Sequence, residues 1–256
     1  MAVPLSHSIL PFVAVLYIIG TPIGNLGDLS FRSVEILKKT DLIACEDTRQ
    51  TSKLLNHLGI KAKMLSCRAQ NQESAARKII TLLKEGKDIA YTSDAGTPAL
   101  SDPGALLVRA AAEAGFEVIP IPGPSAFSAL LSVSGGLDKS VLFEGFLSSK
   151  PGRRKKRLRE LLDTGFGFII YESPHRVVKL FDDLADLECN RYVCVGREMT
   201  KFHEEYLRGS VQEICGILRE KAEKSEIRGE FSVFVSGMIS NNNVNYYLDH
   251  ADKEGR

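Results

Sequence analysis

Short apolar runs alternate with amphipathic stretches along the first half of the chain. Continuous apolar runs are typical of buried strands, whereas apolar residues three and four positions apart are typical of helices. Strands are predicted at residues 13–19, 42–45, 88–92 and 117–120. Helices are predicted at residues 31–38 and 73–85, after Gly104, and from Pro124. Strands that alternate with helices in this way predict a mostly parallel sheet.

The second half carries strand and helix patterns in a different order. Strands are predicted near residues 141–146, 166–171, 192–197, 204–208 and 230–236. Helices are predicted near residues 153–163, 174–187 and 210–223. The later strands are joined by connections too short for a crossover helix, so this sheet is predicted to be mixed, with antiparallel pairs.

These patterns predict an α/β protein made of two α/β domains with a cleft between them. A composition change at residues 132–138 marks the predicted boundary. The predicted parts are a leader over residues 1–15, an N-terminal domain over 16–132, a C-terminal domain over 133–240 and a disordered polar tail over 241–256. The leader is apolar but lacks a basic region and contains Pro4 and Pro11, so it suits neither a signal peptide nor a membrane span.

Composition is typical of a soluble globular protein of a reducing compartment. The formal net charge of +1 gives no overall attraction to nucleic acid, so any basic surface must be local. The five cysteines are odd in number and include no C-x-x-C pair, which argues against a disulfide framework and a thiolate zinc site. We therefore expect a cytoplasmic protein without a metal site or a membrane segment.

Three loops rich in Gly and Pro follow predicted strands of the first half. They read GTPIGNLGD over residues 20–28, SDAGTPALSDPG over 93–104 and PIPGPSA over 120–126. Any one of them could be only a tight turn. Because loops that follow parallel strands share one edge of the sheet, the three together predict a ligand site there. Their glycine spacing matches neither a dinucleotide fingerprint nor a phosphate loop, although Glu46 and Asp47 stand where an acid would bind a ribose.

Seven motifs occur in an order that is specific to one family. From about residue 17 to about residue 237, GTPIGNLGD, CEDTR, SDAGTPALSDPG, PIPGPSA, FEGFL, YESPHR and GREMTK closely resemble the tetrapyrrole methylase superfamily, and within it the ribosomal RNA small subunit methyltransferase I branch. The resemblance implies an S-adenosylmethionine-dependent enzyme that methylates the ribose 2′-oxygen of a cytidine in small-subunit (16S) ribosomal RNA. It also implies a homodimer, with the cofactor in the cleft between the two domains.

Carried over residue by residue, the resemblance implies a set of cofactor-binding residues. These are Ile23, Asp94, Thr97, Ser125, Ala126 and Tyr171. The chemistry agrees, because a sulfonium ligand carries positive charge and no phosphate. Backbone carbonyls and an acid suit its charged and hydroxyl-bearing parts, and amides suit its carboxylate.

Methyl transfer to a ribose hydroxyl depends on alignment, and a base that accepts the hydroxyl proton adds to the rate. The catalytic candidates from the last two motifs are Glu172, Glu198 and Lys201. Further candidates for the base are Glu46, Asp47, Asp102 and His175. Ser173 and Pro174 form a good helix start, so His175 and Arg176 could instead belong to the first turn of a helix.

A dense basic run predicts a local RNA-binding surface. Its seven cations are Lys150, Arg153, Arg154, Lys155, Lys156, Arg157 and Arg159. Leu158, Leu161 and Leu162 can pack on one side of a helix there while the cations stay in solvent. A charge run is usually just a solvated face, but in a chain of nearly balanced charge it favours an anionic partner. Arginines that suit either phosphate contacts or structural salt bridges are Arg49, Arg176 and Arg197.

Two other functions remain open at this point. One is a small-molecule methylase that acts on a tetrapyrrole, and the other is a non-enzymatic RNA-binding assembly factor. The basic run and the motifs YESPHR and GREMTK favour small-subunit ribosomal RNA, within the assembled subunit, as the partner.

Overall fold

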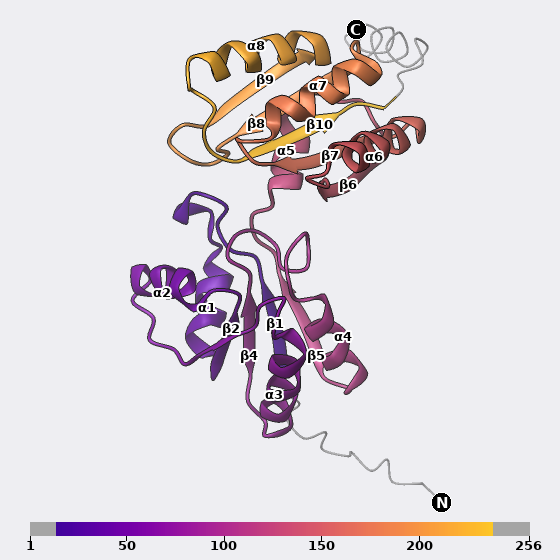
Figure 1. Ribbon diagram of the computed structural model, residues 1–256. Coiled ribbons are helices and arrows are strands. Elements are labelled where there is room, and N and C mark those ends of the chain that lie inside the picture. The colour runs from indigo at the N-terminus through magenta and orange to yellow at the C-terminus, as the bar shows by residue number, and fades with distance from the viewer. Residues whose placement is uncertain (1–13, 238–256) are drawn as a thin grey trace, which may run out of the picture. The chain divides into compact units, whose positions relative to one another are not determined.

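The computed structural model describes residues 14–237, and the chain divides between Ser125 and Ala126 into two compact units. The predicted tail over 241–256 and the first thirteen residues of the predicted leader lie outside the described residues. The leader was predicted to reach residue 15, but strand β1 already begins at Val15, and Ala14 is buried. Figure 1 shows the elements of both units.

The first unit is built on a five-stranded sheet whose strand pairs are all parallel. Its order is β3-β2-β4-β1-β5. The strands are β1 (Val15–Ile19), β2 (Leu42–Cys45), β3 (Met64–Ser66), β4 (Ile89–Thr92) and β5 (Glu117–Ile121). Strand β4 is buried along its whole length, as its continuous apolar run predicts.

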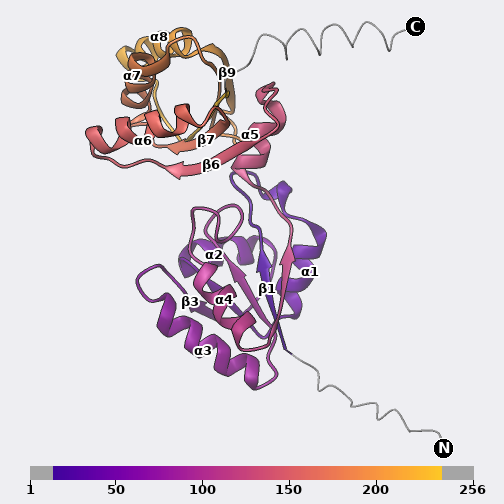
Figure 2. The same ribbon diagram turned by 90° about the vertical axis from the view of Figure 1, so that its right-hand side faces the viewer.

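Helices cover both faces of this sheet. They are α1 (Phe31–Lys39), α2 (Thr48–His57), α3 (Gln72–Lys84) and α4 (Ala105–Glu113), with a 3-10 helix η1 (Leu26–Asp28) before α1. Helices α3 and α4 pack against one face through Ile79 and Leu107, and α1 and α2 pack against the other through Leu37 and Leu55. Figure 2 shows α3 and α4 on the side of the sheet opposite α1.

The second unit is built on a mixed five-stranded sheet of order β6-β7-β10-β8-β9. Strands β6 and β7 pair in parallel, and the other neighbours pair antiparallel. The strands are β6 (Val141–Phe146), β7 (Gly167–Glu172), β8 (Tyr192–Arg197), β9 (Glu205–Ser210) and β10 (Phe231–Val235). The helices are α5 (Ala126–Ser134), α6 (Pro151–Asp163), α7 (Val177–Glu188) and α8 (Val211–Glu223).

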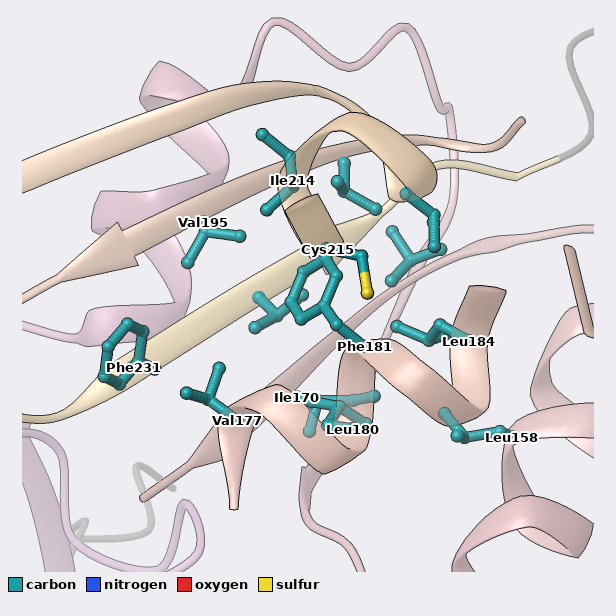
Figure 3. Packing of buried hydrophobic residues seen from close by; sticks show 14 of the residues in the cluster. Leu158, Ile170, Val177, Leu180, Phe181, Leu184, Val195, Ile214, Cys215 and Phe231 are labelled. Atoms are coloured by element: carbon teal, nitrogen blue, oxygen red, sulfur yellow. The ribbon is translucent and has the colours of Figure 1, made fainter. Parts of the chain in front are cut away.

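Apolar side chains of α6, α7 and α8 form the main core of the second unit. Figure 3 shows Phe181 and Leu184 of α7 beside Ile214 of α8 and Val195 of β8, and all four are buried. These positions recur at helical and strand spacing in the sequence, which is why the elements were predictable.

Helix α5 explains why the boundary between the units differs from the predicted one. The prediction placed the boundary after residue 132, at the Gly-rich stretch, whereas the structure divides the chain before Ala126. Helix α5 contacts β8 and β10, and the Ser134 carbonyl accepts a 2.6 Å hydrogen bond from the Tyr192 hydroxyl. The Gly-rich stretch therefore lies within the second unit.

Two α/β units, one with a parallel sheet and one with a mixed sheet, confirm the predicted fold class. None of the helices found between residues 14 and 237 is long and apolar enough to span a membrane.

Candidate functional site

The three Gly/Pro loops meet at the edge of the first sheet where its strands end, hereafter the carboxyl edge. The loop after β1 and the loop after β4 are joined at Thr21 and Gly96. The Thr21 amide donates to the Gly96 carbonyl at 2.9 Å, and the Gly96 amide donates back to the Thr21 carbonyl at 3.0 Å. The convergence that the sequence predicted is therefore confirmed for these two loops.

The backbone of the loop after β5 contacts the backbone of the loop after β1. The Gly20 amide donates to the Ile121 carbonyl at 3.1 Å, and a Cβ on Gly123 would lie 2.5 Å from the Gly20 carbonyl oxygen. A side chain at Gly123 would push the two loops apart. The two glycines thus set the spacing of the carboxyl edge.

The loop after β4 also reaches the loop after β5. The Thr97 hydroxyl donates to the Pro124 carbonyl at 3.4 Å. Ile23 lies against Gly96, at 3.4 Å from the position of a Cβ there. Three predicted cofactor-binding residues, Ile23, Asp94 and Thr97, thus belong to loops that touch each other, and Ser125 directly follows the contact at Pro124. Ala126 and Tyr171 belong to the second unit. The cofactor role of all six residues stays a prediction.

The loop after β4 is held in a strained conformation. Ala99 and Ser101 have positive φ angles of 66° and 64°, which residues other than glycine rarely adopt. The Ala99 amide is bound by the Pro103 carbonyl at 3.2 Å, and Gly104, with φ of 134°, packs on the Tyr91 ring. Strain of this kind persists where the surroundings enforce it, and it is concentrated at functional sites.

Carboxylates without cationic partners gather at the carboxyl edge. Glu46 follows β2, and Asp94 and Asp102 lie in the loop after β4. None of the three forms an ion pair with any of the residues that the structure describes. Burial raises the pKa of Asp102 to about 6, and the negative charge of Glu46 adds to the shift. Burial and the charge of Asp94 likewise raise the pKa of Glu46.

Asp47 differs from these three carboxylates. It caps α2 and pairs with Arg49 at 2.6 Å and with Arg68 at 3.7 Å. Hydrogen bonds from the Arg49 side chain and amide hold the pKa of Asp47 well below its usual range. Asp47 also donates its own amide to Asp94 at 2.9 Å, so it orients Asp94 while its own charge is neutralised.

The carboxyl edge therefore combines negative charge with backbone groups and hydroxyls. Carboxylates without an ion pair favour a cationic ligand, because its charge relieves the repulsion that adds to burial in raising the pKa of Asp102 and of Glu46. The hydroxyls of Tyr91 and Thr92 lie beneath these loops and are buried without a hydrogen-bond partner. The acids at the ends of β2 and β4 were visible in the sequence, but only the fold shows that Glu46 and Asp102 influence one another.

Glu172 in the second unit is held by its own neighbours. Its side chain is fully buried, accepts a 2.8 Å hydrogen bond from the Ser173 amide, and lies 2.9 Å from the Arg176 guanidinium. Arg176 in turn donates to the Leu147 carbonyl at 2.7 Å. This arrangement suits a structural role for both side chains, whereas the neighbouring His175 is exposed.

Glu198 and Lys201 form an ion-pair network with Glu230. The Lys201 ammonium lies 2.8 Å from a carboxylate oxygen of each acid, and the Glu230 amide donates to Glu198 at 3.0 Å. Burial alone would raise the pKa of Glu198, but the hydrogen bonds from Lys201 and the Glu230 amide outweigh it and lower the pKa. Burial likewise acts to lower the pKa of Lys201, and its two carboxylate partners raise it instead. The two catalytic candidates therefore form a charge-neutralising pair, and their catalytic role stays a prediction.

Tyr171 lies in a group of aromatic rings. Its ring centroid is 5.1 Å from that of Phe143 and 5.8 Å from that of Phe146, both in edge-to-face geometry. Phe127 of α5 extends the group, at 5.4 Å from Phe143. Phe146 is 62% exposed, so this aromatic group reaches the surface of the second unit.

The basic run forms helix α6, but its cations do not all face solvent. Arg154 is buried and pairs with Asp183 at 2.7 Å, so the prediction that it binds RNA is wrong for this side chain. Its position is one turn from Leu158, on the face that packs against the core. The remaining ion pairs of the run join Lys155 to Asp186, Arg157 to Glu144 and Glu160, and Lys156 to Glu160.

Three cations of the run have no ion pair within residues 14–237. They are Lys150, Arg153 and Arg159, and all three are exposed. Of the other predicted phosphate contacts, Arg49 is exposed but paired with Asp47. Arg197 is largely buried between the Arg228 carbonyl and Glu205.

Comparison with known proteins agrees with the fold and the motifs. The family model described as Tetrapyrrole (Corrin/Porphyrin) Methylases matches residues 15–215. Two solved structures share the fold at low sequence identity. A uroporphyrin-III-C-methyltransferase from Thermus thermophilus has a TM-score of 0.60 at 17% identity, covering 87% of this chain and 94% of that one. A cobalt precorrin-4 methyltransferase has a TM-score of 0.63 at 18% identity, with the same coverage.

Curated relatives are much more similar in sequence. A protein of Borrelia garinii subsp. bavariensis is 46% identical over 222 residues, which cover 87% of this chain and 98% of the relative. A protein of Bacillus subtilis is 42% identical over 230 residues, covering 90% of this chain and 77% of the relative. Both are named ribosomal RNA small subunit methyltransferase I. This chain belongs to the tetrapyrrole (corrin/porphyrin) methylase family and, within it, to the branch of these relatives.

Proposed function

We propose that this methyltransferase methylates the ribose 2′-oxygen of a cytidine in small-subunit ribosomal RNA, and that it acts on the assembled subunit as a cytoplasmic homodimer. The observation that carries the proposal is the 42–46% identity, over most of the chain, to relatives named ribosomal RNA small subunit methyltransferase I. The choice of the 2′-oxygen and of cytidine rests on the seven sequence motifs alone.

S-adenosylmethionine is the methyl donor of this family, and it supplies an electrophilic methyl group on a positively charged sulfur. The carboxyl edge fits such a group, because Glu46, Asp94 and Asp102 form no ion pair within residues 14–237, while the nearby Arg49 and Arg68 both pair with Asp47. We infer that Ile23, Asp94, Thr97 and Ser125 hold the donor. Ala126 and Tyr171 are proposed to complete its binding.

A carboxylate held in a strong ion pair is a weaker proton acceptor, because the cation lowers its pKa. Glu172, Glu198 and Lys201 are held by cations or carboxylates, as described above, which makes them better suited to shaping the protein than to accepting a proton. Asp102 has no such partner, and its pKa of about 6 leaves it mostly ionised near neutral pH while still basic enough to accept a proton. We therefore favour Asp102 as the base.

Methyl-labelled S-adenosylmethionine tests the proposal directly. Wild-type protein is incubated with assembled small subunits, with naked small-subunit RNA, or with a tetrapyrrole precursor. We expect label in the assembled subunit, and nuclease digestion to release 2′-O-methylcytidine. Label only in the tetrapyrrole would overturn the proposal, and label in no substrate would favour an assembly factor.

Two matched variants connect that activity to the carboxyl edge. Asp102→Asn removes the charge and the proton acceptor, and should lower turnover more strongly than donor binding. Glu113→Gln changes an exposed acid at the end of α4 and should change neither. Equal turnover in both variants would exclude Asp102 as the base.

A further inference from the structure

The loop between β8 and β9 exposes an aromatic side chain. Phe202 is 97% exposed, and the His203 ring stands against it at 5.0 Å in edge-to-face geometry. Full burial of a Phe side chain stabilises a protein by about 2–3 kcal/mol, so an isolated exposed Phe gains nothing for folding. The fold of the unit therefore does not account for the position of this ring.

The loop that carries Phe202 is built to hold its shape. Glu198 and Thr200 have positive φ angles of 50° and 65°. The Thr200 amide donates to Glu204 at 2.8 Å, and Lys201 is fixed by two carboxylates at 2.8 Å each. Met199 is buried beneath the loop. Because strained residues are held by this network, Phe202 is presented on a rigid support rather than on a loose loop.

A groove with an excess of cations lies beside the aromatic pair. Its lining includes His203, Lys224 and Arg228. Arg197 and Lys221 also line it, but both pair with Glu205, at 3.2 and 2.7 Å. The side chains of Lys224 and Arg228 are exposed and have no ion pair in the described part of the chain.

Of the described residues, only two acids line the groove, Glu198 and Glu226. Glu198 is neutralised by Lys201 at 2.8 Å, which leaves Glu226 as the one lining acid without an ion pair among residues 14–237. An exposed aromatic ring next to unpaired cations is the combination that binds single-stranded nucleic acid, in which bases stack on rings and phosphates contact Lys and Arg.

We propose that Phe202, His203 and the groove of Lys224 and Arg228 bind a single-stranded segment of the RNA substrate, with an unpaired base stacked on Phe202. The inference rests on the proposed function in one respect, because it takes RNA as the substrate. A second copy of this chain is the other possible occupant. The unpaired cations favour a polyanion, since a copy of a chain with net charge +1 offers no general negative charge.

The variant Phe202→Ala distinguishes RNA from a second copy of the chain as the occupant. Its binding to a labelled short single-stranded RNA is measured by fluorescence anisotropy. Stacking on one base contributes about 1–3 kcal/mol, so binding should weaken about 5- to 150-fold, and Phe202→Trp should keep most of the affinity. Phe31→Ala is the matched control, because Phe31 is a 92% exposed aromatic in the other unit. It should leave RNA binding unchanged.

The cations of the groove have a separate readout. Removing Lys224 and Arg228 together, as Lys224→Gln and Arg228→Gln, should reduce the slope of log affinity against log salt by about 1.4, or about 0.7 for each lost phosphate contact to a single strand. Donor binding, measured by calorimetry, should stay unchanged in every variant of this set.

Three results would overturn the inference. They are unchanged RNA affinity in Phe202→Ala, absence of RNA binding by the wild type, and a shift from dimer to monomer in sedimentation with RNA binding intact. The proposed function is judged separately, by label transfer from the donor to small subunits by the wild type. Either conclusion can therefore fail while the other stands.

Discussion

Three buried or half-buried carboxylates of the second unit are paired with cations, whereas three carboxylates at the carboxyl edge of the first unit are not. Asp183 pairs with buried Arg154 at 2.7 Å, Glu172 with Arg176 at 2.9 Å, and Glu198 with Lys201 at 2.8 Å. In contrast, the carboxyl edge holds Glu46, Asp94 and Asp102 with no ion pair to any described residue. The paired acids support the fold of the second unit, and the acids of the carboxyl edge are those that we propose to face the donor.

The pKa values follow the same division. Burial acts to raise the pKa of Glu205, but hydrogen bonds from Lys221 and Arg197 outweigh it and lower the pKa. Burial also acts on Asp102 and Glu46, and there the neighbouring acids add to it, so both pKa values rise. Protonation of Glu205 would therefore weaken its ion pairs in the second unit. Protonation of Asp102 or Glu46 would remove the repulsion between these acids, and it would also weaken their attraction for a cationic ligand.

The largest expected effect is the loss of the buried pair in the second unit. Arg154→Ala leaves Asp183 largely buried without its cation, and breaking such pairs costs about 3–5 kcal/mol. Because Asp183 keeps some contact with water, we expect about 3 kcal/mol. Urea unfolding followed by circular dichroism measures this loss, with the neighbouring exposed Arg153→Ala as the control. A loss equal to that of the control would mean that Asp183 does not depend on its partner.

The next effect concerns donor binding at the carboxyl edge. Asp102 has a pKa of about 6, so it is mostly ionised at pH 7.5 and mostly protonated at pH 5. The affinity for S-adenosylmethionine should therefore fall about 10-fold between these values, the change in the ionised fraction of one group. Calorimetry at both pH values measures it. Asp102→Asn should bind more weakly and show less pH dependence, and an equally steep profile in that variant would assign the effect to Glu46 instead.

A smaller effect of opposite sign is expected for stability. The pKa of Asp102 is raised from 3.8 to about 6 in the folded state, so the folded protein binds more protons and loses stability as pH rises through this range. Because Asp102 is only half-buried, we expect about 1 kcal/mol after allowing for solvent screening. Asp102→Asn should remove this loss, becoming more stable relative to wild type at pH 7 than at pH 4. Urea unfolding of both proteins at pH 4 and pH 7 measures this. The same difference in free energy of unfolding between variant and wild type at both pH values would contradict the prediction.

The sequence predicted those strands and loops that depend on residues close together in the chain. Strands β1 and β4 are continuous apolar runs, and the glycines and prolines that follow them predicted the converging loops. Strand β3 and helix α2 were not predicted, because β3 is three half-buried residues and α2 buries only Thr51 and Leu55 on an otherwise polar surface. Such short or polar elements depend on their neighbours in the fold.

Two of the ion pairs could not be predicted, because their partners are distant in sequence. Arg154 and Asp183 are 29 positions apart, as are Lys201 and Glu230. The density of cations in the basic run therefore indicated a surface but not which side chains are available. Phe202 gave no signal either, because a single apolar residue in a polar loop has no periodicity that distinguishes an exposed ring from a buried one.

The smallest effect is expected for an exposed ion pair of the second unit. It shows whether an ion pair that is not buried stabilises this unit. Lys156 lies two residues from Arg154 on α6 and pairs with Glu160 at 3.9 Å, but its side chain is 80% exposed. Exposed pairs of this spacing contribute about 0.3–0.5 kcal/mol. Lys156→Gln should therefore change the free energy of unfolding by less than about 0.5 kcal/mol, and high salt should abolish even that difference. A loss as large as that of Arg154→Ala would show that the network along α6, rather than burial of one pair, holds the helix in place.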